Sequence, residues 1–210
     1  MLATLGIKGF AALRRDRRKQ LEALRQPGGG ALPPMARERI ERLLDRLELA
    51  MAQIAKIEAA RDAVVTRKEA PTDTAEGMIR SLCELRAIGP ELATLLTREA
   101  FVREFPDRRA LAGYVGLGGT PYASGGEARE QGIGKDGNKR VRAAMMELAW
   151  LWLRWQQDSA LSIWFRARVG QAKGRIRKIM IVALARKLLV ALWRYVKDGV
   201  IPEGAKMKAA

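Results

Sequence analysis

The residues best suited to chemistry in this sequence gather in one polar, glycine-rich stretch from Tyr114 to Arg142. Ser124 is the single serine in it, and Gly125 and Gly126 follow directly. Cations accompany the serine along the same stretch: Arg129, Lys135, Lys139, Arg140 and Arg142. Attack on a phosphodiester needs a nucleophile together with cations that offset charge on the phosphate oxygens. A solvated turn or a simple phosphate contact would use the same residue types, so the pattern alone leaves these interpretations open.

The distribution of charge predicts a polyanionic partner. The formal net charge is +16, and residues 129–210 hold 18 Lys/Arg against 6 Asp/Glu, a balance of +12. Nucleic acid is favoured over a membrane, because the longest wholly apolar run of the C-terminal third, Ile179 to Ala185, is far shorter than the roughly 20 residues of a membrane span. We therefore expect no membrane partner and a cytoplasmic, nucleoid-associated protein.

Missing residue types exclude several kinds of chemistry. The sequence has no histidine, and Cys83 is its single cysteine. A zinc site of the usual kind, a Ser-His-Asp triad, a Cys-His pair and a disulfide within the chain are therefore excluded. We expect no cofactor to be bound by this chain alone, and Cys83 is expected to be a small core residue.

Residues 1–70 are predicted to form a helical hairpin with coiled-coil character. A first helix is expected over about residues 8–24, and its basic run at 14–19 forms a solvated face or contacts nucleic acid. The Gly- and Pro-rich segment 26–34 ends it. In the next helix apolar residues recur alternately three and four positions apart, with Arg61 the one exception: Ile40, Leu43, Leu47, Ala50, Ile54, Ile57 and Val64. The partner of this stripe would be the first helix or a second subunit, and we favour an antiparallel hairpin that also forms a homo-oligomer.

Residues 71–210 form the second expected domain, after a hinge at residues 70–72. A turn around Gly89 resembles a helix-hairpin-helix, in which backbone N–H groups bind DNA phosphate without reading bases. Ala87 stands where that motif has its first glycine, so an ordinary helix–turn–helix packing unit is an alternative. Another short helix is expected between residues 101 and 114, before the long glycine-rich loop.

Two helices are expected after the loop. Asn138 is a candidate N-cap for the first, whose expected inner face is Val141, Met145, Leu148, Trp152 and Trp155. The tryptophans at 150, 152 and 155 are expected in the core, with stacking on bases as the alternative. The second helix spans about residues 173–196, and a basic cluster at its start is a candidate nucleic-acid contact: Lys173, Arg175, Arg177 and Lys178. No strand pattern stands out, so we predict an all-α fold with one long loop.

The second half of the sequence resembles the C-terminal transposase domain of the insertion-sequence 110 family, also called the 110/116/902 group. The resemblance covers about residues 82–154 and rests on several motifs in family order and spacing. These are Ala87-Ile88-Gly89-Pro90, then Phe105, Leu111, Ala112, Tyr114, Gly116 and Leu117, then Ser124-Gly125, and finally the run from Ile133 to Lys139 with Arg142. The preceding heptads match the family's coiled-coil region in position and type.

The resemblance implies a DNA recombinase that excises and inserts a mobile element, with Ser124 as the nucleophile that becomes linked to DNA. It also implies a structured guide RNA, or bridge RNA, encoded by the element. The family's N-terminal RuvC-like domain, with four acidic metal ligands, has no counterpart before Met35, so we expect Mg²⁺ only together with that domain. Glu127, Glu130 and Asp136 lie near the serine in the sequence, but carboxylates so close together on a loop seldom form a preorganised metal site.

The sequence thus predicts the coiled coil and catalytic C-terminal portion of such a transposase, as a truncated copy or one half of a split enzyme. The alternative is a dimeric, non-catalytic nucleic-acid-binding module that acts as a transposase remnant or regulator. A scaffold protein built on the coiled coil is a third possibility, which the charge of residues 129–210 disfavours.

Overall fold

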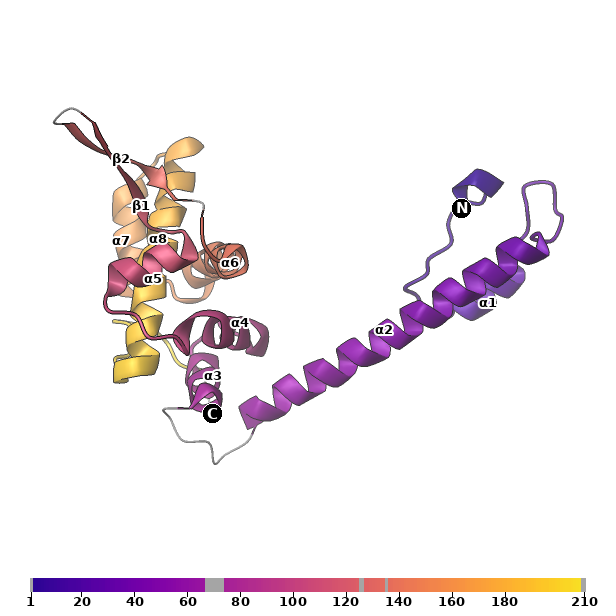
Figure 1. The fold of residues 1–210 in the computed structure, drawn as a ribbon, viewed down its shortest axis with the longest axis horizontal. Helices are drawn as coiled ribbons and strands as arrows, with labels where there is room; N and C mark the ends of the chain where they lie inside the picture. The colour runs from indigo at the N-terminus through magenta and orange to yellow at the C-terminus, as the bar shows by residue number, and fades with distance from the viewer. Residues whose placement is uncertain (1, 67–73, 125–126, 135, 209–210) are drawn as a thin grey trace. The chain divides into compact units, whose positions relative to one another are not determined.

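The computed structural model describes residues 2–66, 74–124, 127–134 and 136–208, and the chain divides into two compact units, Met1–Ala59 and Ala60–Ala210 (Figure 1). Nearly all of the regular structure is helical, as expected for an all-α protein. The expected hinge at residues 70–72 lies outside the described residues. The elements are, in order, η1 (Ala3–Leu5), α1 (Arg17–Ala23), α2 (Pro34–Thr66), α3 (Ala75–Glu84), α4 (Pro90–Leu96), η2 (Thr97–Phe101), α5 (Arg108–Val115), β1 (Gly119–Ser124), β2 (Glu127–Ile133), α6 (Lys139–Trp155), α7 (Ala160–Val169) and α8 (Arg175–Asp198).

In the first unit the short helix α1 packs against the N-terminal half of α2. Leu21 is buried with Ile40 and Leu44, and Arg18 forms ion pairs with both Asp45 and Glu48. The arginines hold the pKa of Glu48 at about 2, because Arg18 and then Arg17 donate hydrogen bonds to its carboxylate. The expected hairpin is therefore present, but its first helix is shorter than the predicted 8–24. Gly9 adopts a left-handed φ of 88°, and the closely spaced cations at 14–19 disfavour one continuous helix.

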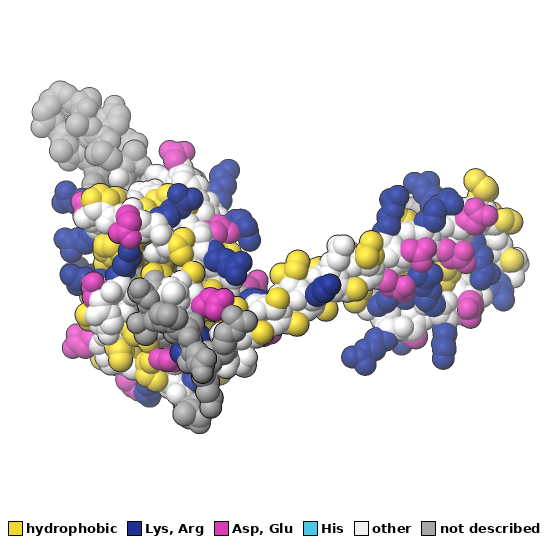
Figure 2. All heavy atoms as spheres, turned by 60° about the horizontal axis from the view of Figure 1, so that its bottom comes forward, with side chains coloured by type: hydrophobic (Ala, Val, Ile, Leu, Met, Phe, Trp, Pro, Cys, Tyr) yellow, Lys and Arg dark blue, Asp and Glu magenta, His cyan; other side chains and the backbone are white. Residues whose placement is uncertain are grey.

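The apolar stripe of α2 divides into parts with different surroundings. Ile40 is buried by the N-terminal segment, and Val64 is buried in the core of the second unit. The middle is exposed, with Ile54 at 55% and Ile57 at 70%, and Figure 2 shows hydrophobic side chains on the surface of this helix. Despite its length α2 is too polar to cross a bilayer, and none of the other helices in the described ranges is long and apolar enough to do so.

The second unit is built around α6 and α8, which make the largest contact between helices in the described part of the chain. Trp152 fills the centre of its core and donates its indole N–H to the hydroxyl of buried Ser159 at 2.9 Å. Asn138 caps α6 as predicted, accepting the backbone N–H groups of Arg140 and Val141. The cap fixes where the chain leaves the glycine-rich stretch and becomes helical.

Within the expected loop the structure has an antiparallel β-hairpin. Backbone pairing runs from Gly119 opposite Ile133 to Ser124 opposite Glu127, with an irregularity between Gly119 and Thr120. Figure 1 shows the two strands extending away from the helices of their unit. The prediction of a loop without strands was wrong here. Polar residues and glycine hide the alternation of hydrophobicity that marks a half-buried strand.

The turn between α3 and α4 is held by the C-terminal tail of the protein. Leu85 pairs with Met207, and Lys208 donates its side-chain amine to the carbonyl oxygen of Ile88 at 2.7 Å. Gln156 also donates its side-chain amide to the carbonyl oxygens of Arg86 and Lys206. Within this turn Ala87 has a φ of 82°, the left-handed conformation that an L-residue other than glycine adopts at a cost.

We predict that Ala87→Gly stabilises the second unit by about 1 kcal/mol, because glycine removes the left-handed strain. Urea unfolding followed by tryptophan fluorescence measures this directly, since all five tryptophans lie in residues 150–193. Ala143→Gly, on the exposed face of α6, is the matched control and should destabilise by a similar amount. Destabilisation by both substitutions would contradict the assignment of strain to Ala87.

Candidate nucleic-acid interface

The base of the hairpin is a joint where three stretches of backbone come too close for any side chain. Gly116 ends α5 with a φ of 72°, and a Cβ atom placed on it would lie 2.1 Å from the carbonyl oxygen of Asp136. Gly137 has a φ of 99°, and its Cβ atom would lie 2.3 Å from the carbonyl oxygen of Tyr114. Both glycines are required, so the end of α5, the base of the hairpin and the start of α6 form one fixed unit.

Glu99 organises this joint from the π-helical turn η2. Its carboxylate accepts the side-chain amide of Asn138 at 2.9 Å and the guanidinium of Arg140 at 2.8 Å. Its backbone carbonyl oxygen accepts the hydroxyl of Tyr114. Asn138 therefore uses its side-chain oxygen to cap α6 and its side-chain nitrogen to bind Glu99, which places the α6 N-terminus against η2.

Arg142 belongs to the same joint. One of its Nη atoms lies 3.3 Å from the carbonyl oxygen of Val115 and 3.5 Å from that of Asp136. Its side chain is half-buried, so it bridges the two ends of the stretch that contains the hairpin. Of the cations predicted to bind nucleic acid, Arg142 and Arg140 thus already have partners inside the protein.

Ser124 is the last residue of β1 and pairs with Glu127 at the end of the hairpin away from this joint. Arg129 lies on β2 opposite Tyr122. The predicted contacts Gly125, Gly126 and Lys135 lie outside the described residues. The backbone therefore brings Ser124 and Arg129 onto neighbouring strands, and the Ser124–Glu127 pair is the sixth counted from the Gly119–Ile133 pair at the base.

The remaining predicted cations lie on two other parts of the second unit. Lys139 is exposed at the first turn of α6. The cluster at the start of α8 is also exposed, and its members are Lys173, Arg175, Arg177 and Lys178. Arg177 lies over the ring of Trp150, 5.3 Å from its centroid. Trp150 is eleven residues beyond Lys139 and hence about 16 Å further along α6. The structure thus separates these cations into distinct groups.

Two of the three α6 tryptophans differ from the expected core placement. Trp152 is fully buried, whereas Trp150 and Trp155 are 44% and 51% exposed, each beneath an arginine guanidinium. Trp150 lies on the side of α6 away from the buried row of Val141, Met145 and Leu148. Trp155 is the last residue of α6 and is half exposed there, so its expected core position was wrong.

Gly89 lies at the N-cap of α4 in an extended conformation, and a Cβ atom there would meet nothing within 4 Å. Protein packing alone does not require a glycine at this position. The helix–turn–helix geometry around it is present, and its contact with DNA stays a prediction.

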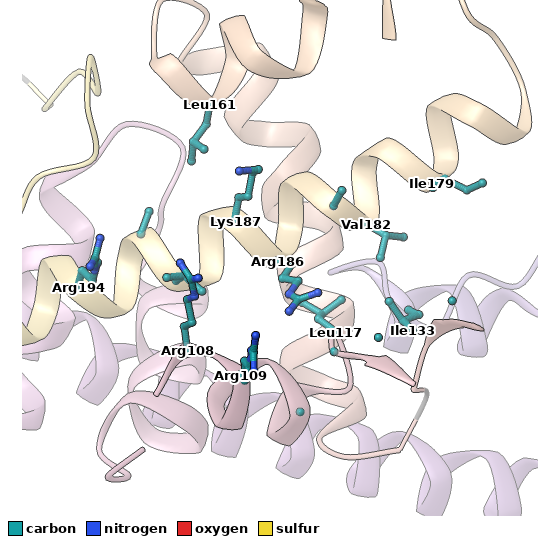
Figure 3. A pocket seen from close by; sticks show the side chains of 17 residues that line it. Arg108, Arg109, Leu117, Ile133, Leu161, Ile179, Val182, Arg186, Lys187 and Arg194 are labelled. Carbon is teal, nitrogen blue, oxygen red and sulfur yellow. The ribbon is translucent and has the colours of Figure 1, made fainter. Parts of the chain in front are cut away.

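A groove between α5 and α8, at the base of the hairpin, contains residues that sequence reasoning missed (Figure 3). We call it the α5–α8 groove. Its volume is about 1280 Å³, and its cations are Arg108, Arg109, Arg186, Lys187 and Arg194. No aspartate or glutamate is among the described residues that line it. The sequence did carry a signal, because Arg186, Lys187 and Arg194 follow one another at helical spacing along α8, interleaved with apolar residues.

The first turn of α5 is fixed by Asp107, which brings two of these cations to the groove. Its carboxylate accepts the backbone N–H groups of Ala110 and Arg109, and these hydrogen bonds hold the pKa of Asp107 below its usual value. Arg108 and Arg109 thus begin a capped helix whose other end is the glycine joint.

Gly137→Ala should destabilise the second unit by roughly 2–4 kcal/mol, because the new methyl group meets the carbonyl oxygen of Tyr114 and the φ is left-handed. Gly132→Ala is the control. Gly132 also has a positive φ, but its Cβ atom would meet nothing within 4 Å, so a loss of about 1 kcal/mol is expected. Equal losses in urea unfolding would show that close packing at the joint does not decide the effect.

Arg142 and Lys139 should respond differently to the same substitution. Arg142→Gln should lower the free energy of unfolding by about 1 kcal/mol, because two carbonyl oxygens lose a charged donor. Lys139→Gln should leave stability unchanged, weaken DNA binding, and lower the dependence of log affinity on log salt concentration by about 1. Unfolding and binding titrations on both variants test this. A stability loss confined to Lys139→Gln would contradict the assignment of Arg142 to the joint and of Lys139 to DNA binding.

Comparison with known proteins identifies the second unit. Residues 79–163 match the model of the transposase IS116/IS110/IS902 family. Over 99% of its length the chain is 46% identical to y4rJ of Sinorhizobium fredii, which carries the name of a transposase, and it covers 54% of that protein. It is 28% identical, over 90% of its length, to a Pseudomonas aeruginosa protein named as a family 20 transposase, again covering 54% of it. The chain spans about half the length of these curated relatives, and residues 79–163 carry its similarity to the IS116/IS110/IS902 transposase family.

Proposed function

We propose that this chain takes part in moving an insertion sequence by exchanging phosphodiester bonds, with Ser124 as the nucleophile. The observation that carries the proposal is the position of Ser124. It ends a strand of a hairpin whose base is fixed by Gly116, Gly137 and Asn138, beside a groove that carries five cations. A fixed base gives the strand that ends at Ser124 a defined direction, and the cations of the groove can hold nucleic acid at the base of the same hairpin.

The proposed strand exchange needs no reactant other than the Ser124 hydroxyl and the two DNA strands. The oxygen of the Ser124 hydroxyl forms a bond to phosphorus while the bond from phosphorus to a sugar oxygen breaks. The proton that the serine loses is balanced by the one that the departing sugar oxygen gains. A sugar hydroxyl of a second strand then attacks the same phosphorus and releases the serine, so one phosphodiester replaces another.

Magnesium has no ligand set in the described part of this chain. Among those residues no three carboxylate, histidine or cysteine side chains lie together in an arrangement that could hold a metal ion. The family resemblance places the acidic ligands in a RuvC-like domain, and experiments on this chain should be run with and without such a domain.

DNA and a guide RNA are the proposed partners, and α2 is the proposed surface for a second copy. The support for the copy is the exposed middle of α2, with Leu43, Ile54 and Ile57 on the predicted heptad stripe. More than one active site is needed to join two element ends, which favours a homo-oligomer.

Ser124→Ala should abolish a covalent protein–DNA product while noncovalent binding stays within about twofold, because the hydroxyl is proposed to react and not to anchor. The assay uses labelled DNA flanking the coding region in its source genome, with RNA transcribed from it, and a denaturing gel detects the product. Tyr122→Phe, which removes another hydroxyl from the same strand, is the control and should keep the product. Persistence of the product in Ser124→Ala, or its loss in Tyr122→Phe, would reject the assignment.

A non-catalytic nucleic-acid-binding module is the second candidate, and the α5–α8 groove favours it independently of the serine. That candidate requires steeply salt-dependent binding and no covalent product in any combination of the chain, a RuvC-like domain and RNA. A covalent product that depends on Ser124 would rule it out.

A further inference from the structure

The cations of the α5–α8 groove are available to an external ligand. In the described part of the chain none of the five forms an ion pair. Lys187 lies over the ring of Trp164, and the charges of Arg109 and Arg108 act on the nearby Asp107 carboxylate. Figure 3 shows Arg108 and Arg109 on α5 pointing toward α8 on the side that carries Arg186, whereas Lys187 points toward Leu161 of α7. With no acidic residue among the described lining, the groove is a concentrated positive field and selects for an anionic ligand.

The spacing of the cations fits a polymer. Arg186 and Arg194 lie eight residues apart on α8, about 12 Å along the helix axis, a wider spacing than a single small anion needs. The groove volume of about 1280 Å³ also exceeds the roughly 300–1,000 Å³ of sites for small molecules. A chain with repeated negative charges satisfies both observations.

The floor of the groove is apolar, which distinguishes between forms of nucleic acid. Beside its cations α8 presents Val182, Ala183, Val190 and Ala191, and Ile133 adds to the same surface. A duplex presents its phosphates and sugars to such a wall and keeps its bases stacked inside. An unpaired strand exposes the faces of its bases, and these can bury apolar surface while the phosphates contact arginine.

Gly113 gives an independent indication of a ligand that approaches closely. It lies inside α5 and lines the groove, and a Cβ atom placed on it would meet nothing within 4 Å. Its φ is not left-handed, so neither packing nor backbone conformation within the described residues explains a glycine that costs about 1 kcal/mol relative to alanine in a helix. A ligand lying against the α5 backbone does explain it.

We propose that the α5–α8 groove binds an unpaired stretch of nucleic acid, with phosphates on the arginines of α5 and α8 and bases over the apolar floor. The inference rests on the proposed function for the identity of the polymer as nucleic acid. It adds the site, the unpaired state of the strand and the residues that hold it. The strand would lie at the base of the hairpin that carries Ser124.

The test measures binding of the full chain to three labelled probes of one sequence: single-stranded DNA, single-stranded RNA and duplex DNA. Arg186→Gln should weaken binding of at least one single strand about tenfold, the loss expected for one charge-assisted contact, and change duplex binding less than about twofold. The slope of log affinity against log salt for that strand should fall by about 0.7. Arg168→Gln, an exposed arginine of α7 outside the groove, is the matched control and should change none of the three.

Gly113→Ala provides a variant that cannot lose binding through unfolding. It should raise the urea midpoint of tryptophan fluorescence and at the same time weaken single-strand binding several-fold, because the methyl group occupies space that the strand uses. Higher stability with unchanged affinity would overturn the role given to Gly113 and the proposal with it.

The remaining outcomes separate this proposal from the function on which it rests. An equal loss for duplex and single strands in Arg186→Gln would overturn the unpaired state, and no loss for any probe would overturn the groove as a nucleic-acid site. Ser124→Ala should bind all three probes like the unsubstituted chain. If the unsubstituted chain binds nucleic acid through the groove but forms no covalent product, Ser124 is rejected as the nucleophile and the groove assignment stands. If the chain forms the product but Arg186→Gln binds all three probes unchanged, the groove assignment is rejected and the nucleophile stands. The better-bound single strand identifies the polymer as DNA or RNA.

Discussion

Close approach of backbone at the base of the β-hairpin is the constraint on which the second unit depends. The chain passes the same point three times, at the end of α5, after β2 and at the start of α6, and Gly116 and Gly137 leave room for the carbonyl oxygens that meet there. Asn138 binds the carbonyl oxygen of Tyr114 through its backbone N–H and ties the start of α6 to η2 through Glu99. The direction of the hairpin, and with it the position of Ser124, is set at these contacts.

Sequence patterns predicted the parts of the structure that local chemistry determines. Asn138 caps α6 because its side chain satisfies backbone N–H groups at a helix start, and α2 and α8 follow from apolar periodicity. The hairpin was missed because the sequences of its strands show no alternation of apolar and polar residues. The bound tail was missed because Leu85 and Met207 meet across more than a hundred residues of sequence. Contacts of that kind depend on tertiary packing, which no local pattern records.

Charge composition predicted a nucleic-acid partner but not the residues that would meet it. Arg142 and Arg140 lie in the most suggestive stretch, yet they bind carbonyl oxygens and Glu99 within the protein. Arg186 and Arg194 lie in an ordinary amphipathic helix, yet their side chains line a groove without acidic neighbours among the described residues. The difference arises from the shape of the surface, because an arginine that already satisfies buried acceptors has fewer donors left for phosphate.

Helix α8 connects these features because its two faces serve different purposes. One face carries Ile181, Leu184, Leu188 and Leu192 into the core against α6, which fixes the helix in position and rotation. The other face then has no freedom to turn away, so Arg186 and Arg194 are held toward α5 and the base of the hairpin. Because α6 also begins at the glycine joint, the same core orients the groove and the strand that ends at Ser124. A strand bound in the groove would thus meet a hairpin whose direction is already fixed, which is the preorganisation that attack on a phosphate requires.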